Sequence, residues 1–297
     1  MRLKDIGEFG LIERFKKRIK LDSTVIQGSG DDCAVIRWDK NNYLLYTCDM
    51  IIEGVDFEPK EKPFLIGRKA MAISVSDIAS CAGVPRYAVV SMGLPKNTTL
   101  ARIDAISRGM FEVARKYKIN IVGGDLSRAQ KLVIDVSMLG VVRKSELVLR
   151  SGAKKGDIIF VTGRLGGSRR GKHLKFTPRI KEASHLVKNY KINSMIDISD
   201  GLIQDLGHIL HQSRVGGVLF EELIPLAGEA RNIKDACFMG EDFELIFTTT
   251  RKEASRLIQR EGKKFFPIGE IVDKKYGIKF EDNKELIFSG EEGFRHF

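Results

Sequence analysis

Residues 74–80 read SVSDIAS, a run in which one carboxylate, Asp77, stands among small and apolar side chains. Residues four, three and four positions apart lead up to it: Ile66, Ala70, Ile73 and then Asp77. This spacing predicts a helix that turns Asp77 inward with its apolar face, where an unpaired carboxylate is strongly disfavoured. A similar segment, DISDGLI at 197–203, follows in the other half of the chain. We therefore expect both acidic segments to hold metal ions.

Length and composition indicate a soluble protein of two domains, or of one large domain. The chain has 297 residues, of which 43% are hydrophobic, enough for a substantial core. No apolar run approaches the roughly 18 residues that span a bilayer, and the first ten residues contain no hydrophobic signal core. We expect a cytoplasmic protein without membrane contact. The four cysteines are widely scattered, so a disulfide framework or a zinc site is not expected.

Helical and strand patterns alternate, which favours a mixed α/β (α+β) class. The first half predicts a strand at 43–48, helices around 66–77 and 103–117, and a strand from 119 that enters a glycine turn at 123–125. A polar, glycine-bearing stretch at 143–157 predicts the boundary between domains 1–145 and 146–297. The second half predicts a strand at 157–163, a helix at 202–210 and a half-buried strand at 242–249.

Aspartates recur at the ends of apolar elements or on their inner faces: Asp32, Asp49, Asp77, Asp125, Asp197 and Asp200. Asp32 belongs to the segment GSGDDCAV at 28–35, where glycines permit a tight turn and paired acids offer hard oxygen ligands. Such carboxylates suit Mg²⁺, which commonly bridges to substrate phosphates. For Asp200 an equal alternative is the N-cap of the following helix.

The basic segment RLGGSRRGKHLK at 164–175 could be a phosphate-binding loop, a nucleic-acid-binding segment or an ordinary basic turn. It satisfies GxxxxGK, but His173 stands where a P-loop needs Ser or Thr, so we expect an ordinary basic glycine turn. The net charge of +11 keeps nucleic-acid binding as an alternative for this segment, although no aromatic stacking pattern or recognised binding motif supports it.

The ordered set of motifs resembles thiamine-monophosphate kinases over nearly the whole chain. The motifs include GSGDDCAV, TCDMIIEGVDF, AISVSDIASCAGVP, IVGGDLSR, RSGAKKGD, DISDGLIQDL, GEDFELIFT and the ending GFRHF. The resemblance implies the two-domain fold of aminoimidazole ribonucleotide synthetase, with an N-terminal domain that forms a dimer barrel. It also implies a homodimer whose domains hold ATP in the cleft between them through several Mg²⁺ ions.

The resemblance also implies roles for individual residues. The metal-binding positions match Asp32, Thr47, Asp49, Asp77, Asp125, Asp197 and Asp200, with Cys48 contributing through its carbonyl in place of the usual Thr. The nucleotide contacts match Gly124, Asp125, Arg150 and Ser199. The thiamine contacts match Glu241 and Phe294, and Asp56 stands where the family commonly has His.

The implied reaction is direct in-line transfer of the ATP γ-phosphoryl group to thiamine monophosphate. The attacking phosphate oxygen is already anionic, so no general acid or base is needed, and magnesium lowers the repulsion between the two phosphates. Asp49 and Asp125 are the residues whose loss is expected to collapse turnover. The alternatives are another ATP-dependent enzyme of the same superfamily and, from a different class, a basic nucleic-acid-binding protein.

Overall fold

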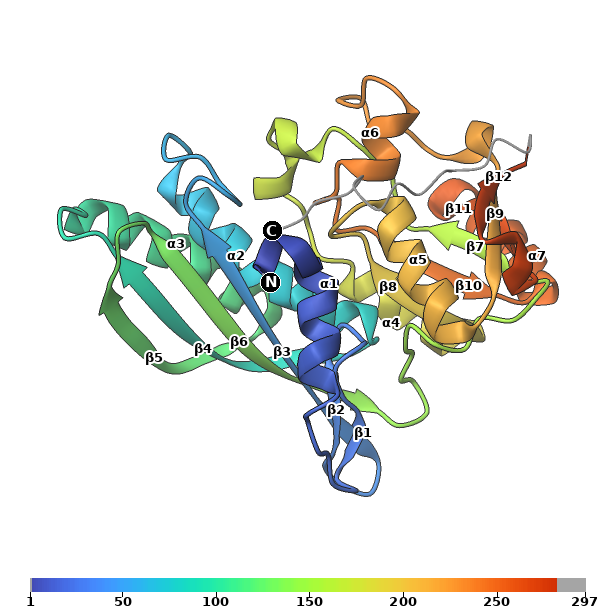
Figure 1. Cartoon of the computed structure of the whole chain (residues 1–297), viewed down its shortest axis with the longest axis horizontal. Helices are drawn as coiled ribbons and strands as arrows, with labels where there is room; N and C mark the ends of the chain where they lie inside the picture. Colours follow the sequence, from blue (N-terminus) through green and yellow to red (C-terminus); the bar gives the residue numbers. More distant parts are fainter. Residues whose placement is uncertain (1, 282–297) are drawn as a thin grey trace.

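The computed structural model describes residues 2–281 and contains two six-stranded sheets flanked by helices (Figure 1). Strands from Val25 to Arg143 form the first sheet, and strands from Ile158 to Phe280 form the second. Each sheet combines antiparallel pairs with a parallel pair, so the expected mixed α/β class is confirmed. Among residues 2–281, no helix has both the length and the apolar character that a membrane crossing needs.

The first sheet has the strand order β1-β2-β3-β6-β4-β5, and only the outermost pair, β4 and β5, is parallel. Its strands are β1 (Val25–Gln27), β2 (Ala34–Arg37), β3 (Asn42–Ile52), β4 (Val84–Leu94), β5 (Asn120–Arg128) and β6 (Val133–Arg143). A parallel pair requires a crossover connection, which helix α3 (Leu100–Tyr117) provides between β4 and β5.

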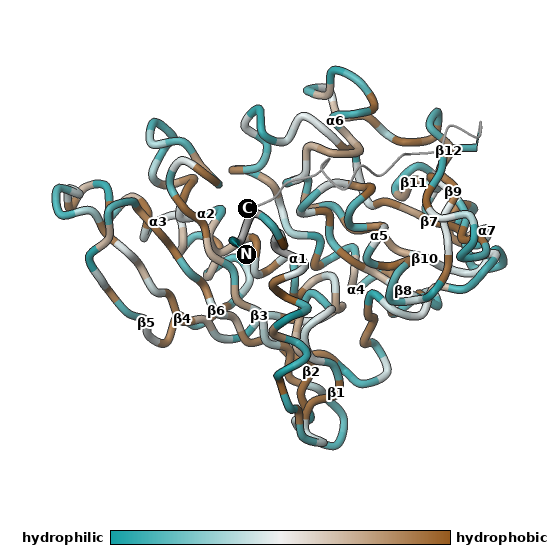
Figure 2. The backbone as a smooth tube through the Cα atoms, viewed as in Figure 1, coloured by the Kyte–Doolittle hydropathy of each residue, from teal (hydrophilic) through white to brown (hydrophobic). Residues whose placement is uncertain are grey.

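Two long helices, α2 (Pro63–Ser80) and α3, cover one face of this sheet. Pro63 lies in the first turn of α2, where its missing N–H removes no helical hydrogen bond. The Thr99 side chain caps α3 by accepting a hydrogen bond from the Arg102 N–H at 3.3 Å. Both helices expected in the first half are confirmed, and Figure 2 shows hydrophobic residues concentrated along α2 and the sheet strands.

On the other face of the first sheet, several large side chains are exposed in the part of the chain that the structure describes. Cross-strand rows on this face run Tyr46–Leu139–Tyr87, Cys48–Ser137–Val89 and Met50–Asp135–Ser91–Asp125. Tyr46, Met50 and Tyr87 are between 44% and 51% exposed. Several large exposed hydrophobic side chains on adjoining strands are typical of a surface that another protein covers. We call this surface the open sheet face.

The second sheet has the order β12-β9-β11-β7-β10-β8. Its strands are β7 (Ile158–Val161), β8 (Ile192–Asp197), β9 (Gly216–Leu219), β10 (Leu245–Thr249), β11 (Phe266–Val272) and β12 (Ile278–Phe280). The remaining α-helices are α1 (Leu3–Lys16), α4 (Ile180–Asn189), α5 (Leu202–Ser213), α6 (Ile233–Phe238) and α7 (Arg251–Glu261). Short 3-10 helices are η1 (Ser168–Arg170), η2 (Lys172–Leu174), η3 (Glu221–Leu223), η4 (Gly262–Lys264) and η5 (Lys274–Tyr276).

The glycine turn expected at 123–125 is wrong, because β5 continues through these residues to Arg128. Gly124 instead permits close strand pairing, since a Cβ atom there would lie 1.8 Å from the carbonyl oxygen of Val90. A glycine pair at the end of an apolar strand is compatible with either a turn or a close backbone approach. The neighbouring strand, which the local sequence does not identify, decides between them.

Candidate active site

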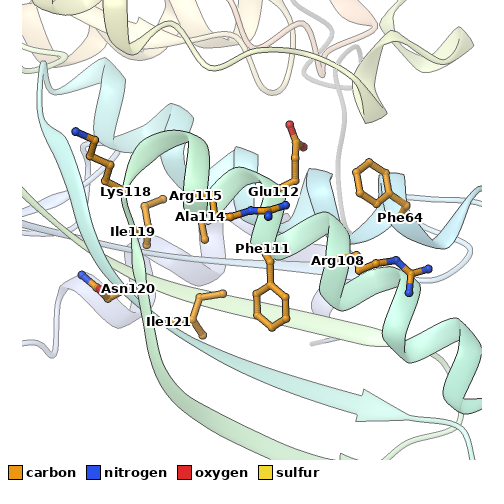
Figure 3. A pocket seen from close by; sticks show the side chains of 10 residues that line it. All are labelled: Phe64, Arg108, Phe111, Glu112, Ala114, Arg115, Lys118, Ile119, Asn120 and Ile121. Atoms are coloured by element: carbon orange, nitrogen blue, oxygen red, sulfur yellow. The ribbon is translucent and has the colours of Figure 1, made fainter.

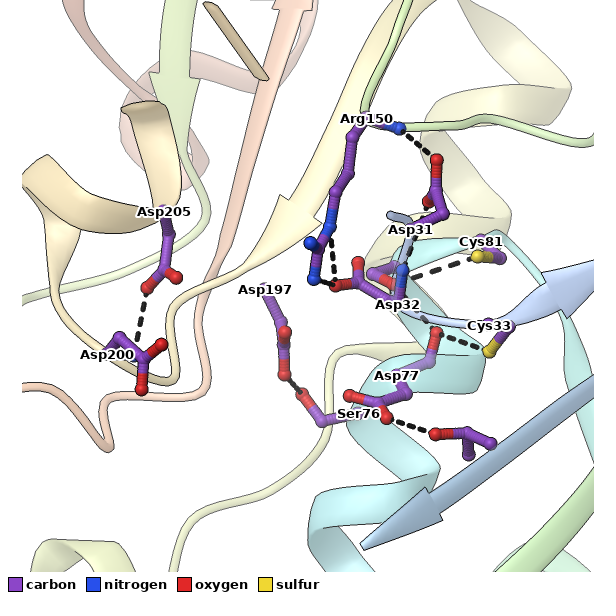
Figure 4. Close-up of polar contacts among 12 residues, drawn as sticks. Asp31, Asp32, Cys33, Ser76, Asp77, Cys81, Arg150, Asp197, Asp200 and Asp205 are labelled. Atoms are coloured by element: carbon purple, nitrogen blue, oxygen red, sulfur yellow. Dashed lines mark hydrogen bonds and ion pairs between the residues drawn. The ribbon is translucent and has the colours of Figure 1, made fainter. Parts of the chain in front are cut away.

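Three carboxylates from distant parts of the sequence meet between the two sheets (Figure 4). Asp32 precedes β2, Asp77 lies on α2, and Asp197 is the last residue of β8. One carboxylate oxygen from each residue lies within 4.8 Å of the others. The structure thus brings together three of the predicted metal ligands. We call this group the carboxylate cluster.

Hydroxyl groups orient the carboxylates of the cluster. The Ser76 hydroxyl donates a hydrogen bond to Asp197 Oδ2 at 2.5 Å, and the Thr47 hydroxyl donates one to Asp77 Oδ2. A carboxylate oxygen accepts more than one hydrogen bond or cation, so these bonds leave acceptor capacity in the cluster. Thr47 is a predicted metal-site residue, and here it contacts a predicted ligand directly.

Asp49 on β3 lies beside the cluster and accepts a hydrogen bond from the Ser74 hydroxyl at 2.8 Å. Burial, with repulsion from neighbouring carboxylates, raises the pKa of Asp49 to about 6 and the pKa of Asp197 to about 8. The same causes raise the pKa of Asp77 well above its ordinary value. A divalent cation would offset this repulsion and favour the charged forms.

Arg150 neutralises only one side of Asp32. Its guanidinium Nε donates to Asp32 Oδ1 at 3.0 Å, and its backbone N–H donates to Asp31 Oδ2 at 3.0 Å. Among the described residues, the other oxygen, Asp32 Oδ2, is buried without a hydrogen-bond partner. A buried orphan carboxylate oxygen within a group of hard oxygen donors fits Mg²⁺ well.

A second group of ligand atoms comes from Asp200, Asp205 and His208, which also lie within 4.8 Å of one another. The interpretation of Asp200 as the N-cap of α5 is wrong, because Gly201 takes that position. Asp205 in the first turn reaches back, and its Oδ2 accepts the N–H groups of Asp200 and Gly201 at 3.0 Å each. The Asp200 carboxylate instead accepts a hydrogen bond from Gln204 at 2.8 Å.

Gly124 and Asp125 lie apart from the carboxylate cluster. Asp125 is on β5, three strands from β3, and its side chain is on the open sheet face. Three strand spacings are about 14 Å, and Asp49 points to the opposite face of the sheet. The Cys48 side chain is also on the open sheet face, with Sγ 3.3 Å from Asp135 Oδ2. The thiol of Cys48 therefore points away from the carboxylate cluster. The contact between its backbone carbonyl oxygen and a metal ion stays a prediction.

Two predicted substrate residues line one small cavity. Asp56 and Glu241 belong to a cavity of about 170 Å³, together with Val55, Phe57, Glu58, Glu61, Arg169 and His173. The Asp56 carboxylate accepts the Ile52 N–H at 2.7 Å, which stabilises the turn after β3. Phe294, the third predicted substrate contact, lies outside the described residues. We call this space the acidic cavity.

A different cavity, of about 990 Å³, lies between α3 and β5 (Figure 3). Its lining includes Phe64, Phe111 and Ile121 with the basic side chains of Arg108 and Arg115. None of the predicted site residues within 2–281 lines it. Volume alone therefore does not identify the site, whereas the convergence of carboxylates does.

The segment that resembles a P-loop uses its polar groups internally. The Gly166 N–H donates to Asp242 Oδ2 at 2.9 Å, and the Ser168 hydroxyl donates to the same carboxylate. Arg170, in the same segment, pairs with Asp235 at 2.8 Å. The segment forms η1 and η2 and does not open a long helix. These internal pairings favour the interpretation as a basic turn over phosphate or nucleic-acid binding.

Sequence reasoning missed three polar residues of α2 that contact the site: Lys69, Ser74 and Ser76. Ser74 and Ser76 donate to Asp49 and Asp197, while Lys69 lies at the acidic cavity. A signal for Lys69 was present, because it falls on the apolar helix face, three positions after Ile66 and seven before Ser76. A charged residue in that position requires a partner as much as Asp77 does.

Family models match both halves of the chain. The model described as AIR synthase related protein, N-terminal domain, matches residues 30–142. The model described as AIR synthase related protein, C-terminal domain, matches residues 141–280. The chain is thus similar to this group of proteins across both sheets.

Individual proteins match over the full length. A thiamine-monophosphate kinase of Buchnera aphidicola subsp. Schizaphis graminum is 34% identical over 325 residues, covering 99% of each chain. One from Aquifex aeolicus is 33% identical over 311 residues, covering 93% of this chain and 98% of its own. The solved structure "AaThiL complexed with AMPPCP and TMP" has a TM-score of 0.88 at 32% identity, covering 100% of this chain and 99% of that one.

Proposed function

Because this chain belongs to the thiamine-monophosphate kinase family, we propose that its carboxylate cluster supports direct transfer of the ATP γ-phosphoryl group to thiamine monophosphate. The observation that carries the proposal is the meeting of Asp32, Asp77 and Asp197 at one point. Bringing three carboxylates together in an apolar core is unfavourable without a cation, whereas a site that binds metal and polyphosphate requires such a group.

The phosphoryl group passes directly from ATP to thiamine monophosphate, without a covalent enzyme intermediate. A terminal phosphate oxygen of thiamine monophosphate forms the new bond to the γ-phosphorus of ATP. The bond from that phosphorus to the oxygen bridging it to the β-phosphate breaks, and ADP leaves with the electron pair. The attacking oxygen is already anionic at neutral pH, so the site needs no general base.

We propose that Asp32, Asp77 and Asp197 hold Mg²⁺, with Thr47 and Asp49 beside them. Bound magnesium would screen the repulsion between the two phosphate groups as they approach. Arg150 holds Asp32 in place and adds positive charge at the nucleotide side of the site. The hydroxyl of Ser76 keeps the Asp197 carboxylate aimed at the other two.

We further propose that the chain acts as a homodimer joined through the open sheet face. The exposed apolar side chains on that face support this proposal. So does the place of Asp125, because the sheet separates its side chain from the cluster of its own chain. A partner chain would present this residue to the nucleotide.

The direct test is an assay of the purified chain with ATP, Mg²⁺ and thiamine monophosphate. We expect thiamine diphosphate and ADP to form in equal amounts, and Asp77→Asn to reduce turnover by about 100-fold or more while the protein stays folded. Thermal melting checks the fold. Formation of ADP without thiamine diphosphate would reject the proposed acceptor, and near-normal turnover by Asp77→Asn would reject the role of the cluster.

A further inference from the structure

Lys69 is a fully buried cation at the contact between the two halves of the chain. Its side chain is 1% exposed, and it extends from the α2 face that packs in the core. The ammonium group donates to Glu241 Oε1 at 2.6 Å and to the backbone carbonyl oxygen of Asp56 at 2.7 Å. A buried ammonium is tolerated only with such partners, so its position is strongly constrained.

The two partners of Lys69 both line the acidic cavity and come from different halves of the chain. Asp56 follows β3 in the first half, whereas Glu241 belongs to the loop before β10 in the second half. Glu241 has a left-handed backbone with φ of 58°, and its N–H donates to the Ser199 carbonyl oxygen at 2.7 Å. A non-glycine residue in this conformation is strained, which is common where a side chain must be aimed.

The charges around the acidic cavity favour a cationic ligand. Four acidic residues line it, Asp56, Glu58, Glu61 and Glu241, against one arginine, Arg169, and one histidine, His173. Lys69 takes one oxygen of Glu241, which leaves Oε2 on the side of Arg169, whose Nε is 3.9 Å away. Lys69 therefore fixes the direction of the Glu241 carboxylate, and the second oxygen is within ion-pair distance of Arg169.

Helix α2 connects this cavity to the carboxylate cluster. Lys69 and Asp77 are eight residues apart on the helix, a rise of about 12 Å along its axis. One rigid element therefore sets the separation between an acidic cavity and a phosphate-transfer site. That arrangement suits a substrate with a cationic heterocycle at one end and a phosphate ester at the other.

We propose that Lys69 is a positioning residue that holds Glu241 and the Asp56 turn as the two walls that recognise the cationic heterocycle of the substrate. The proposal rests on the proposed function and assigns Lys69 no contact with ATP or with the reacting phosphates. Its loss therefore weakens substrate binding much more than it slows transfer from bound substrate.

The first test is Lys69→Met, which keeps much of the side-chain length and removes the charge. We expect the KM for thiamine monophosphate to rise about tenfold or more, while the KM for ATP and kcat stay within about threefold. A KM for thiamine monophosphate within about twofold of the native value would overturn the proposal. A fall in kcat with both KM values unchanged would also overturn it.

A double-mutant cycle tests whether Lys69 acts through Glu241. Glu241→Gln alone should raise the KM for thiamine monophosphate, and adding Lys69→Met to it should raise that KM by a clearly smaller factor than Lys69→Met does in the native chain, since only the hold on the Asp56 turn is then lost. Multiplied effects of the two substitutions would show that Lys69 acts by another route. The double variant leaves no charge of the pair buried alone, so it carries the test if Lys69→Met does not fold.

The matched control is Arg179→Met. Arg179 pairs with Glu244, another carboxylate with only 2% of its side chain exposed, and neither residue lines the acidic cavity. This variant should lose thermal stability as Lys69→Met does, but its KM for thiamine monophosphate should stay within about twofold. If the KM for thiamine monophosphate rose equally in both variants, the rise in Lys69→Met would be explained by lost stability, and the positioning role of Lys69 would be rejected. Failure of the native chain to form thiamine diphosphate would reject the proposed function, which is a separate outcome.

Discussion

Asp197 ties the stability of the fold to the binding of metal. Burial, followed by the charge of Asp32, raises the pKa of this carboxyl to about 8. An aspartate in an unfolded chain titrates near pH 3.9, so between about pH 4 and pH 8 the metal-free native state retains a proton that the unfolded state has lost. The free energy of unfolding therefore falls as the pH rises through that window. A cation bound to the carboxylate would remove the loss, because it binds the deprotonated form.

We expect the melting temperature without Mg²⁺ to fall between about pH 5.5 and pH 8. Added Mg²⁺ should raise the melting temperature more at the higher pH, as measured by differential scanning fluorimetry. Asp197→Asn provides the control, because an amide does not titrate and should show a smaller shift with Mg²⁺ at pH 8. Equal Mg²⁺ shifts of the native protein at both pH values would argue against metal binding by these carboxylates.

At the scale of secondary structure, α2 is the element that supplies side chains both to the carboxylate cluster and to the acidic cavity. From one helix it supplies Asp77 to the cluster, Ser74 and Ser76 to neighbouring carboxylates, and Lys69 to the acidic cavity. Such a helix must pack closely against the rest of its layer. Two glycines, Gly67 of α2 and Gly109 of α3, allow the two helices to approach closely. A Cβ atom on Gly67 would lie 1.9 Å from the Ile106 carbonyl oxygen.

At the second glycine of this contact, Gly109 of α3, we expect substitution by alanine to lower the free energy of unfolding, whereas it commonly raises it inside a helix. Replacing glycine by alanine inside a helix commonly stabilises it by about 1 kcal/mol. A Cβ atom at Gly109 would lie 1.9 Å from the Phe64 carbonyl oxygen, which is fixed backbone. We therefore expect Gly109→Ala to lower the free energy of unfolding by about 1–3 kcal/mol in a urea titration, because the two helices must separate.

Gly207 of α5 is the matched control for that substitution. The nearest atom to a Cβ there is Ile278 Cδ1, at an ordinary contact distance of 3.7 Å. Gly207→Ala should therefore be neutral or stabilising by up to about 1 kcal/mol. If both variants changed stability in the same direction and by the same amount, helix propensity and not the α2–α3 contact would explain the result.

Across the whole molecule, the sequence predicts what local periodicity encodes and fails where partners are distant. Spacing alone predicts α2 and the inward direction of Asp77, and both agree with the structure. The glycine turn at 123–125 and the capping role of Asp200 were wrong, because strand β4 and the side chain of Asp205 decide those positions. The convergence of the carboxylates was expected from their recurrence, but its geometry depends on how the two sheets pack.

The open sheet face leads to a prediction about how two chains share one site. Asp77 lies in the cluster of its own chain, whereas Asp125 lies on the open sheet face, separated from that cluster by the sheet. If a homodimer forms there, Asp125 of one chain serves the nucleotide bound mainly by the other. Each site then takes its cluster and its Asp125 from different chains.

Mixing two inactive variants distinguishes this arrangement from a site within one chain. We expect Asp77→Asn and Asp125→Asn to be inactive separately and, after joint refolding in equal amounts, to recover about a quarter of native turnover. Half of the dimers would then be mixed, and in each mixed dimer one site would carry both substitutions while the other would carry neither. If Asp125 served its own chain, every site in every dimer would carry one substitution and no activity would return. A chain that sediments as a monomer under assay conditions and is still active would contradict the shared site, because the open sheet face would then have no partner during turnover.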